Sequence, residues 1–458
     1  MGLLGSVLVV AAGWVVAKLP VATPVLGWGP LGRVRDQSWS HPVATAVILL
    51  GVALLGYAWL ALLRRTGAGL GWVRGTAALW TAPFLLAPPL FSNDGWSYAA
   101  QGTLVASGLS PYRYGPGALD GPLRAMIDHR WLETPTPYGP VPLWFGGRLA
   151  RVVTDPLLLA MAHRLLAVLG LVLLAWALPR LARRCGADPV RASALVLCSP
   201  AVLVIGAAGM HNDVLMIGLM AAAVAAAAER GWIIGAAVAG VAAAVKVPGG
   251  LACLAIVLIA LPAGAPMRAR LVRTAGVGVV AAAVLLALGW VSGLGQGWLS
   301  ALSVPGAVIT PLSLMALLGT GLDRALGTHR LADLARQAGQ AVALLVTVVL
   351  LLRRRSGRPD TAVAALALSL GLLVALGPVV QLWYLLWPLP FLAALRLRAD
   401  ALAGLVIGSL VLALFGPVDP LMHETYKVVA PILLGLGAIA ALTNARFPWL
   451  ARVGRALG

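Results

Sequence analysis

Uninterrupted runs of apolar residues, separated by short polar stretches, fill most of the chain. A helix needs about 20 mostly apolar residues to cross a bilayer. Because the runs are continuous rather than alternating, they favour helices over the strands of an outer-membrane barrel. The pattern therefore predicts an all-α polytopic membrane protein with roughly 13–14 transmembrane helices. We place the crossings at residues 3–19, 43–63, 75–91, 156–178, 192–208, 212–228, 232–247, 250–262, 273–291, 338–352, 361–379, 382–395, 401–416 and 428–443.

Two stretches interrupt this pattern. Residues 93–155 are polar and rich in Gly, Pro, Trp and Tyr. A connection of this length is uncommon and is usually either functional or disordered, and its aromatic content favours order. Residues 293–336 form a second interruption, in which the apolar stretch 311–322 predicts a half-helix. We expect one transmembrane domain over residues 1–458 that carries these two outer loops.

Short basic clusters between the apolar runs indicate the orientation. Cytoplasmic loops carry an excess of Lys and Arg. If the clusters lie in the cytoplasm, both termini are cytoplasmic and the loop 93–155 is extracytoplasmic. The clusters are Arg64, Arg65 and Arg74; Arg180, Arg183, Arg184 and Arg191; Arg268, Arg270 and Arg273; Arg353, Arg354, Arg355 and Arg358; and Arg396 and Arg398.

The composition agrees with a membrane protein. Of the 458 residues, 60% are hydrophobic and only 11% are charged, whereas a soluble domain is near half apolar and a quarter charged. The net charge of +19 is explained by the basic loops, so we expect no nucleic-acid partner. The three cysteines are far apart, which favours neither disulfides nor a metal knuckle.

Asp94 stands where the third apolar run meets the long loop. Asn and Asp at such a position often cap a helix. The alternative is a general base at the membrane surface. Both hold if Asn93 caps the helix and Asp94 stays free.

The rest of the loop is rich in aromatic and acidic side chains. Such side chains suit a carbohydrate surface, because rings stack on sugar faces and carboxylates accept hydrogen bonds from hydroxyls. An ordered cap with interfacial aromatics is the alternative interpretation. The candidate sugar-binding residues here are Tyr98, Tyr112, Asp128, Arg130, Trp131, Glu133 and Tyr138.

A second candidate site combines His211, Asn212 and Asp213 with Lys246. Asp213 begins one apolar run and Lys246 ends the next, and the two runs are joined by a turn near residue 230. About 15 helical residues separate each of the two from that turn, so their side chains lie at matching depth near the outer face. One interpretation is a structural Asp213–Lys246 ion pair with Asn212 as a cap. The other is an anion site in which His211 and Lys246 bind a phosphate at a helix start.

Three further residues lie near the same outer face. Arg164 is a second candidate phosphate ligand, although its side chain can also snorkel to the interface. Trp383 and Tyr384 belong either to an aromatic belt or, with Asp213, to the sugar site. The chain has no Walker A motif, no G-x-G-x-x-G after a strand and no H-E-x-x-H motif. An outward-facing enzyme without nucleotide must take its activated group from a membrane carrier such as a polyprenyl phosphate.

At these residues the chain resembles the actinobacterial polyprenol-phosphomannose-dependent α-(1→6)-mannosyltransferases, which have the GT-C fold. The matching segments follow the order of that family and span most of the chain. They are Asn93–Gly102, Gly108–Tyr112, Arg130–Pro140, His211–Gly218, Ala242–Lys246 and Trp383–Trp387.

The resemblance implies a GT-C bundle in the plasma membrane with its active site on the extracytoplasmic side. Asp94 would be the catalytic base, the donor polyprenyl-phosphate-mannose, and the acceptor a lipid-anchored mannan, the backbone of lipomannan and lipoarabinomannan. No D-x-D motif or paired acid accompanies Asp94, so a divalent metal is not implied. The alternatives are a GT-C enzyme with another donor sugar, such as arabinose or glucose, and a lipid-linked sugar flippase or transporter.

Overall fold

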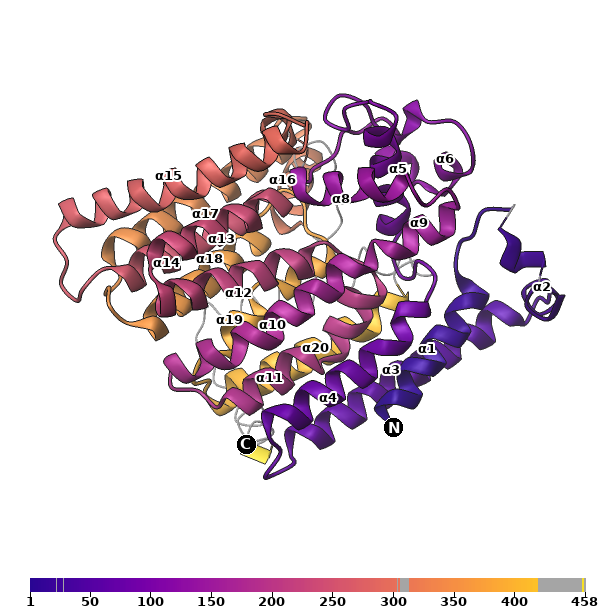
Figure 1. The fold of residues 1–458 in the computed structure, drawn as a ribbon, viewed down its shortest axis with the longest axis horizontal. Coiled ribbons are helices and arrows are strands. Elements are labelled where there is room, and N and C mark those ends of the chain that lie inside the picture. Colours follow the sequence, from indigo (N-terminus) through magenta and orange to yellow (C-terminus); the bar gives the residue numbers. More distant parts are fainter. Residues whose placement is uncertain (22, 28, 303, 305–312, 419–454, 457–458) are drawn as a thin grey trace.

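The computed structural model describes the chain except for residues 22, 28, 303, 305–312, 419–454 and 457–458 (Figure 1). The described residues form helices and no strand. The first half contains α1 (Gly2–Val16), η1 (Pro24–Gly27), α2 (Gly29–Arg35), α3 (Ser40–Leu63), α4 (Leu70–Thr81), η2 (Ala82–Leu86), α5 (Asp94–Ala106), η3 (Pro116–Ala118), α6 (Pro122–Met126), α7 (His129–Leu132), α8 (Pro140–Ala150), α9 (Pro156–Ala162), α10 (Arg164–Arg184), α11 (Pro189–Leu197), η4 (Val202–Ala208) and α12 (Asp213–Arg230). The second half contains α13 (Trp232–Val245), η5 (Val247–Leu251), α14 (Ala252–Ala260), α15 (Met267–Val291), η6 (Gly297–Leu302), α16 (Leu314–Leu326), α17 (Leu331–Arg353), α18 (Pro359–Ala375), η8 (Leu382–Leu386), α19 (Leu389–Ala393) and α20 (Ala399–Val418).

The protein is an all-α polytopic membrane protein, as the apolar runs predict. Among the described residues, five helical stretches are long and apolar enough to cross a membrane, or six if the bent pair α11 and η4 forms one crossing. They are α3, α9 with α10, α15, α17 and α20. Each coincides with a predicted crossing, at 43–63, 156–178, 273–291, 338–352 and 401–416.

Most of the other predicted crossings are shorter or broken helices. The predicted crossing 75–91 is divided at Pro83 into α4 and η2, and the crossing 192–208 bends by 56° between α11 and η4, where Pro200 lies. Helix α13 ends before Lys246 and Pro248. Proline lacks the N–H of a helix interior and disrupts the helix there. The predicted crossing 428–443 lies outside the described residues.

Helices α1 and α3 pack so closely at Gly5 and Gly51 that neither position has room for a side chain. A Cβ atom on Gly5 would lie 2.5 Å from the carbonyl oxygen of Gly51 on α3. Small residues let helix backbones approach in this way in membrane proteins. The opposite end of this helix pair, at the end of α1 and the start of α3, borders the candidate site described below.

The interior of the bundle is built around α12. Nearly all of α12 from Asp213 to Ala227 is buried, and small alanine side chains predominate after Met220. By contrast, α15 and α17 have only 17% of their most apolar window buried. Their outward apolar faces are typical of helices in contact with lipid.

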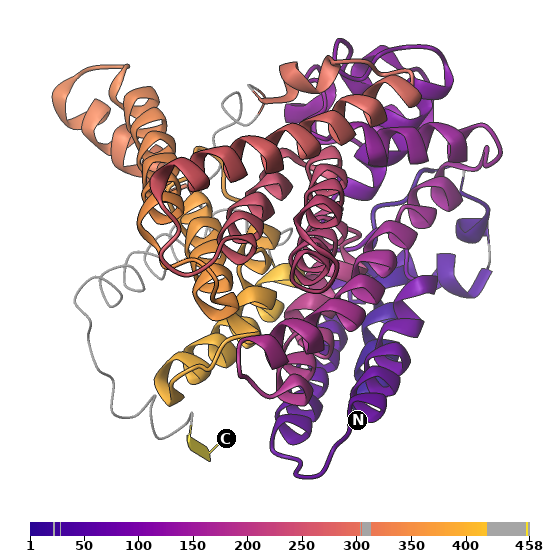
Figure 2. The same cartoon turned by 60° about the vertical axis from the view of Figure 1, so that its left-hand side comes forward.

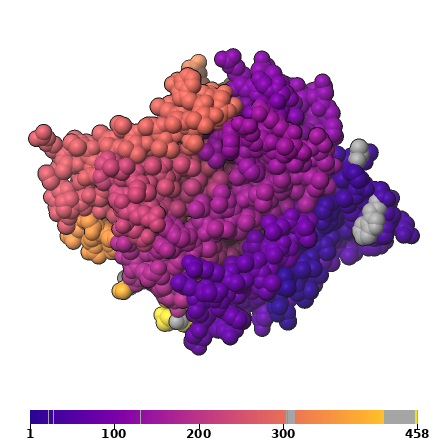
Figure 3. All heavy atoms as spheres, viewed as in Figure 1, coloured from indigo at the N-terminus to yellow at the C-terminus, as the bar shows by residue number. Residues whose placement is uncertain are grey.

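The segment from α5 to α8 gathers at one end of the bundle (Figures 1 and 2). In the space-filling view its purple atoms cover the upper right end, beside the indigo N-terminal helices (Figure 3). The predicted loop 93–155 is thus built mainly of short helices. In the second interruption, α16 occupies Leu314–Leu326, where the sequence predicts a half-helix at 311–322; residues 305–312 lie outside the described part.

Candidate functional site

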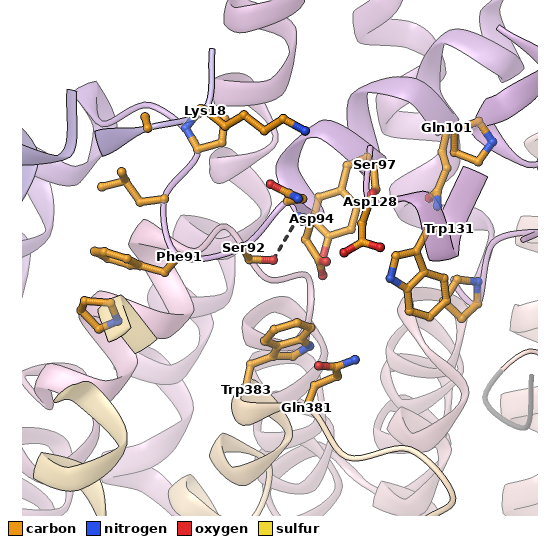
Figure 4. Close-up of a pocket in the computed structure, with 18 of the residues that line it drawn as sticks. Lys18, Phe91, Ser92, Asp94, Ser97, Gln101, Asp128, Trp131, Gln381 and Trp383 are labelled. Carbon is orange, nitrogen blue, oxygen red and sulfur yellow. Dashed lines mark hydrogen bonds between the residues drawn. The ribbon is translucent and has the colours of Figure 1, made fainter. Parts of the chain in front are cut away.

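A cavity of about 400 Å³ opens where the α5–α8 segment meets the ends of several long helices (Figure 4). Its walls come from the end of α1, the start of α3, the connection into α5, the loop between α7 and α8, and η8. Asp94 lies centrally in Figure 4, with Lys18 above it, Asp128 and Trp131 to one side, and Trp383 and Gln381 below. Each of these six residues lines the cavity.

The backbone that presents Asp94 is strained. Phe91 has a φ of 64° and Met210 a φ of 57°, and these are the non-glycine residues with positive φ in the described part of the chain. Bulky side chains rarely adopt this conformation, and such strain clusters at functional sites. Phe91 lies three residues before Asp94 and Met210 one residue before His211, so both turns aim a side chain at the same place.

Helix α5 is also held closely against α8. A Cβ atom on Gly102 would lie 2.6 Å from the carbonyl carbon of Gly146.

The hydroxyl of Ser92 accepts a hydrogen bond from the backbone N–H of Asp94 at 3.0 Å. The predicted cap on Asn93 is wrong: Asn93 occupies the N-cap position, but its side chain accepts no capping bond. Ser92 satisfies the first N–H instead.

One carboxylate oxygen of Asp94 is surrounded by donors. Asp94 Oδ2 accepts from the hydroxyl of Tyr98 at 3.0 Å and from that of Tyr138 at 3.3 Å. His211 Nδ1 lies 3.2 Å from the same oxygen. Within the described residues, Oδ1 has no hydrogen-bond partner, and the side chain is 21% exposed. The carboxylate is therefore fixed through one oxygen and presents the other to the cavity.

These contacts determine the protonation of Asp94. Burial raises the pKa of the carboxyl. Four interactions lower this pKa by more than burial raises it: the hydrogen bond and the charge of His211, the hydrogen bond from Tyr98, and the charge of Lys246. The net result is a pKa below the ordinary value. Donors that favour the charged form have this effect. Asp94 is therefore ionised at neutral pH and can accept a proton.

The interpretation of Asp213 and Lys246 as a buried ion pair is confirmed. Lys246 Nζ donates to Asp213 Oδ1 at 2.9 Å, and Trp387 Nε1 donates to the same oxygen at 2.8 Å. The ammonium also lies 4.1 Å from the ring centre of Tyr384 and 5.5 Å from that of Tyr138. Neither Asp213 nor Lys246 lines the cavity.

The predicted cap on Asn212 is wrong. Asn212 is the N-cap residue of α12 but makes no side-chain capping bond, and both its side-chain polar atoms are buried without a partner in the described residues. His211 has a different neighbour: its ring stacks on Trp383 with the centroids 3.7 Å apart and the planes 15° from parallel. Trp383 thus covers His211 and lines the cavity at the same time.

Arg164 does not face the cavity. Its side chain is 1% exposed, and its guanidinium donates to the backbone carbonyls of Ala87, Pro88, Ala207 and Ala208. These carbonyls follow η2 and end η4, so Arg164 joins the two strained segments. The structure therefore does not bring it to a phosphate position, because its donors are already bonded to the backbone.

The other predicted sugar-binding residues divide into two groups. Those that line the cavity are Tyr98, Asp128, Trp131, Tyr138, Trp383 and Tyr384. Tyr112 is instead buried in a small apolar cluster with Leu143 and Ala301, and Glu133 is exposed outside the cavity. The side chain of Arg130 lies outside the described part. No three His, Cys, Asp or Glu side chains cluster for a metal ion among the residues described.

The sequence interpretation missed the N-terminal wall of the cavity. Lys18, just after α1, and His41, at the start of α3, both line it and are exposed. Gln101 and Gln381 line it as well. Lys18 is one of only three lysines in the chain. That rarity, at the predicted outer end of the first apolar run, was the available signal.

The chain matches known protein families along most of its length. Residues 1–262 match the model described as alpha-(1->6)-mannopyranosyltransferase, N-terminal domain, and residues 309–445 match the MptB C-terminal domain. A probable alpha-(1->6)-mannopyranosyltransferase of Mycolicibacterium smegmatis is 34% identical over 94% of this chain and 87% of its own length. An alpha-(1->6)-mannopyranosyltransferase of Mycobacterium tuberculosis is 31% identical, with 94% and 86% covered. Alpha-(1->6)-mannopyranosyltransferase B of Corynebacterium glutamicum is 29% identical, with 87% and 74% covered.

The buried ion pair generates the first testable prediction. Lys246→Met leaves the buried Asp213 carboxylate without its cation, which costs about 3–5 kcal/mol of stability. We expect a lower melting temperature for the purified protein. The double variant Lys246→Met with Asp213→Asn should recover most of the loss, because the amide oxygen still accepts from Trp387. An unchanged melting temperature with lost affinity for a phosphate-bearing ligand would instead make Lys246 a phosphate ligand.

Proposed function

The chain belongs to the alpha-(1->6)-mannopyranosyltransferase family, and from this membership we propose that it transfers mannose from polyprenyl-phosphate-mannose to the 6-hydroxyl of a growing α-(1→6)-mannan. Asp94 is the general base in this proposal. The observation that carries it is the carboxylate geometry: one oxygen accepts from Tyr98, Tyr138 and His211, and the other faces the cavity. The family names of the relatives support mannosyl transfer.

The proposed reaction needs a base and little other covalent chemistry. The 6-hydroxyl of the acceptor gives its proton to Asp94 Oδ1 while its oxygen forms a bond to C1 of the donor mannose. The bond from C1 to the phosphate oxygen breaks, and polyprenyl phosphate leaves with the electron pair. The attack comes from the face opposite the phosphate, so a β-linked donor yields an α-linked product. Phosphate is an acceptable leaving group, so no general acid is essential.

The cavity walls suit a sugar at this place. Trp131 and Trp383 present aromatic rings, and Asp128 presents a second carboxylate that can accept from sugar hydroxyls. Because Trp383 stacks on His211, a sugar held against Trp383 also lies close to the group that orients Asp94. From the resemblance of its sequence segments, we also propose that the bundle is of the GT-C type, with 93–155 as its catalytic loop.

The position of the cavity supports an extracytoplasmic active site. Its walls include residues 16–18, 41–48, 89–94, 381–384 and 417. In the arrangement inferred from the basic clusters, each of these segments lies at the outer end of a predicted apolar run. Five separate outer ends therefore meet at one cavity. We propose that the protein lies in the plasma membrane with this cavity outside, where a lipid-linked donor and a lipid-anchored mannan are both accessible.

Two other functions remain as alternatives. The same cavity suits a GT-C enzyme with a polyprenyl-phosphate arabinose or glucose donor. A lipid-linked sugar transporter is less well supported, because transport needs no ionised base held by three donors beside a cavity. Lipomannan and lipoarabinomannan backbones are the acceptors that we propose.

A donor panel tests the proposed function. We expect purified wild-type protein to transfer mannose, but not arabinose or glucose, from the polyprenyl phosphate to a mannan acceptor. Asp94→Asn keeps the size of the side chain but cannot take a proton, so transfer should slow at least about a hundred-fold. Donor binding should persist. Asp120→Asn, an exposed acid in the same segment, is the matched control. A near-normal rate for Asp94→Asn would end its assignment as the base.

The pH dependence of transfer tests the role of His211. Since the pKa of Asp94 lies below its ordinary value, the active ionised form persists as the pH falls, and the acid limb of kcat/KM should lie below the usual carboxyl range. His211→Phe keeps a ring against Trp383 but removes the donor. Burial then raises the pKa of Asp94, and the acid limb should move to higher pH. An unmoved limb would contradict the pairing. His329→Phe, at an exposed histidine between α16 and α17 and away from the cavity, is the control.

Labelling of introduced cysteines tests the orientation. Ala118 is exposed on η3 within the α5–α8 segment, and Arg184 is exposed at the end of α10. With the outer envelope made permeable, Ala118→Cys should react with an impermeant thiol reagent on whole cells. Arg184→Cys should react only after the inner membrane is lysed. The reverse pattern would place the cavity in the cytoplasm and rule out the proposed mechanism.

A further inference from the structure

We infer that Lys18 and His41 form the anion subsite that holds the phosphate of the lipid-linked donor and stabilises it as the leaving group. This inference rests on the proposed function and names the part of the cavity that takes the phosphate. Lys18 and His41 thus take the place of His211, Lys246 and Arg164, the phosphate ligands that the sequence suggests.

The basic side chains described in and next to the cavity fall into two classes. Lys246 is buried in its pair with Asp213, and Arg164 is bonded to backbone carbonyls. Both side chains therefore already have protein partners, and neither residue lines the cavity. Lys18 and His41 do line it and are exposed. Across the described ranges, neither of their side chains has a hydrogen bond or an ion pair. They are the basic side chains on the described cavity wall that a ligand can engage without first breaking a contact.

The fold brings the two helix ends that carry these residues to the same cavity. Lys18 lies two residues after the end of α1, and His41 is the second residue of α3. The close contact of Gly5 with Gly51 locks the two helices side by side. Arg35 then fixes the chain before Lys18, because its guanidinium donates to the carbonyls of Trp14 at 2.6 Å and Ala17 at 2.9 Å. The subsite is thus built on paired helix ends.

The charge change of the reaction requires such a subsite. In the donor, the phosphate is a diester with one negative charge. When the bond to C1 breaks, polyprenyl phosphate leaves with the electron pair and carries a second negative charge. Donors aimed at the place where charge develops are a major source of catalysis. The acceptor proton goes to Asp94, so it cannot neutralise the phosphate, and that charge falls to Lys18 and His41.

Figure 4 supports this division of the cavity. The Lys18 side chain extends over the cavity from the α1 side, whereas Asp128 and Trp131 lie on the opposite side of Asp94. The carboxylates and aromatic rings suit sugar hydroxyls and ring faces. The α1–α3 wall adds Val16, Ala17 and Ile48, which are apolar and suit the first isoprene units of the carrier. A phosphate between these regions would join the lipid to the sugar.

Binding of a polyprenyl phosphate to the purified full-length protein tests the inference without requiring transfer. Lys18→Met should weaken binding about tenfold or more, because it removes one charge-assisted hydrogen bond. His41→Leu should also weaken it. Lys18→Arg should restore most of the affinity. Arg33→Met removes the same charge from an exposed position outside the cavity and should bind like wild type. Uncharged polyprenol should bind wild type and Lys18→Met equally weakly.

Steady-state transfer separates the two possible sources of a phosphate. Lys18→Met should raise the KM for the lipid-linked donor and leave the KM for the acceptor unchanged. A rise in the acceptor KM alone would assign the subsite to an acceptor headgroup and overturn the inference. If wild type and Lys18→Met bind polyprenyl phosphate equally, the inference fails while the proposed donor stands. If wild type binds no polyprenyl phosphate at all, both fail.

Discussion

Charged groups buried in an apolar bundle need partners, and this requirement organises the site. A charge inside a membrane protein costs several kcal/mol unless it is paired or faces water. The chain buries Asp213 and meets the cost with Lys246 and Trp387. Asp94 stands one layer further out and is held by three donors at one oxygen. Aromatic rings connect the layers, because Tyr138 contacts the ammonium of Lys246 through its ring and Asp94 through its hydroxyl.

This layered arrangement separates support from chemistry. The inner ion pair fixes the ends of α12 and α13, and thereby the position of His211 and Tyr138 relative to Asp94. Arg164 ties the carbonyls before Asp94 to those before His211, so the two strained turns are set by one buried side chain. The groups that face the cavity include the second oxygen of Asp94, several aromatic side chains and the basic residues Lys18 and His41. Rigid supporting contacts of this kind are what hold a catalytic group in a productive position.

The sequence predicts which residues form the site better than it predicts the contacts among them. Charged residues make up only 11% of the chain and aromatic residues 6%, so Asp94, Tyr138 and Trp383 stand out, and the structure brings all three to one cavity. Hydropathy also places the five long crossings, but it does not detect breaks, because one proline such as Pro83 or Pro200 hardly changes the apolar character of a run. A lone Arg164 or Lys246 suggests a ligand site equally well whether its donors are free or bonded. Lys18 was missed because a basic residue at the end of an apolar run is ordinary at a membrane surface.

A cryo-EM map of the full chain with polyprenyl-phosphate-mannose bound to the Asp94→Asn variant is the most direct test of the central claim. The mannose should occupy the cavity between Trp131 and Trp383, with C1 facing residue 94 and the phosphate toward the α1–α3 wall. Density for the donor at a different cavity, or with C1 turned away from residue 94, would contradict the assignment of Asp94 as the base and of this cavity as the active site.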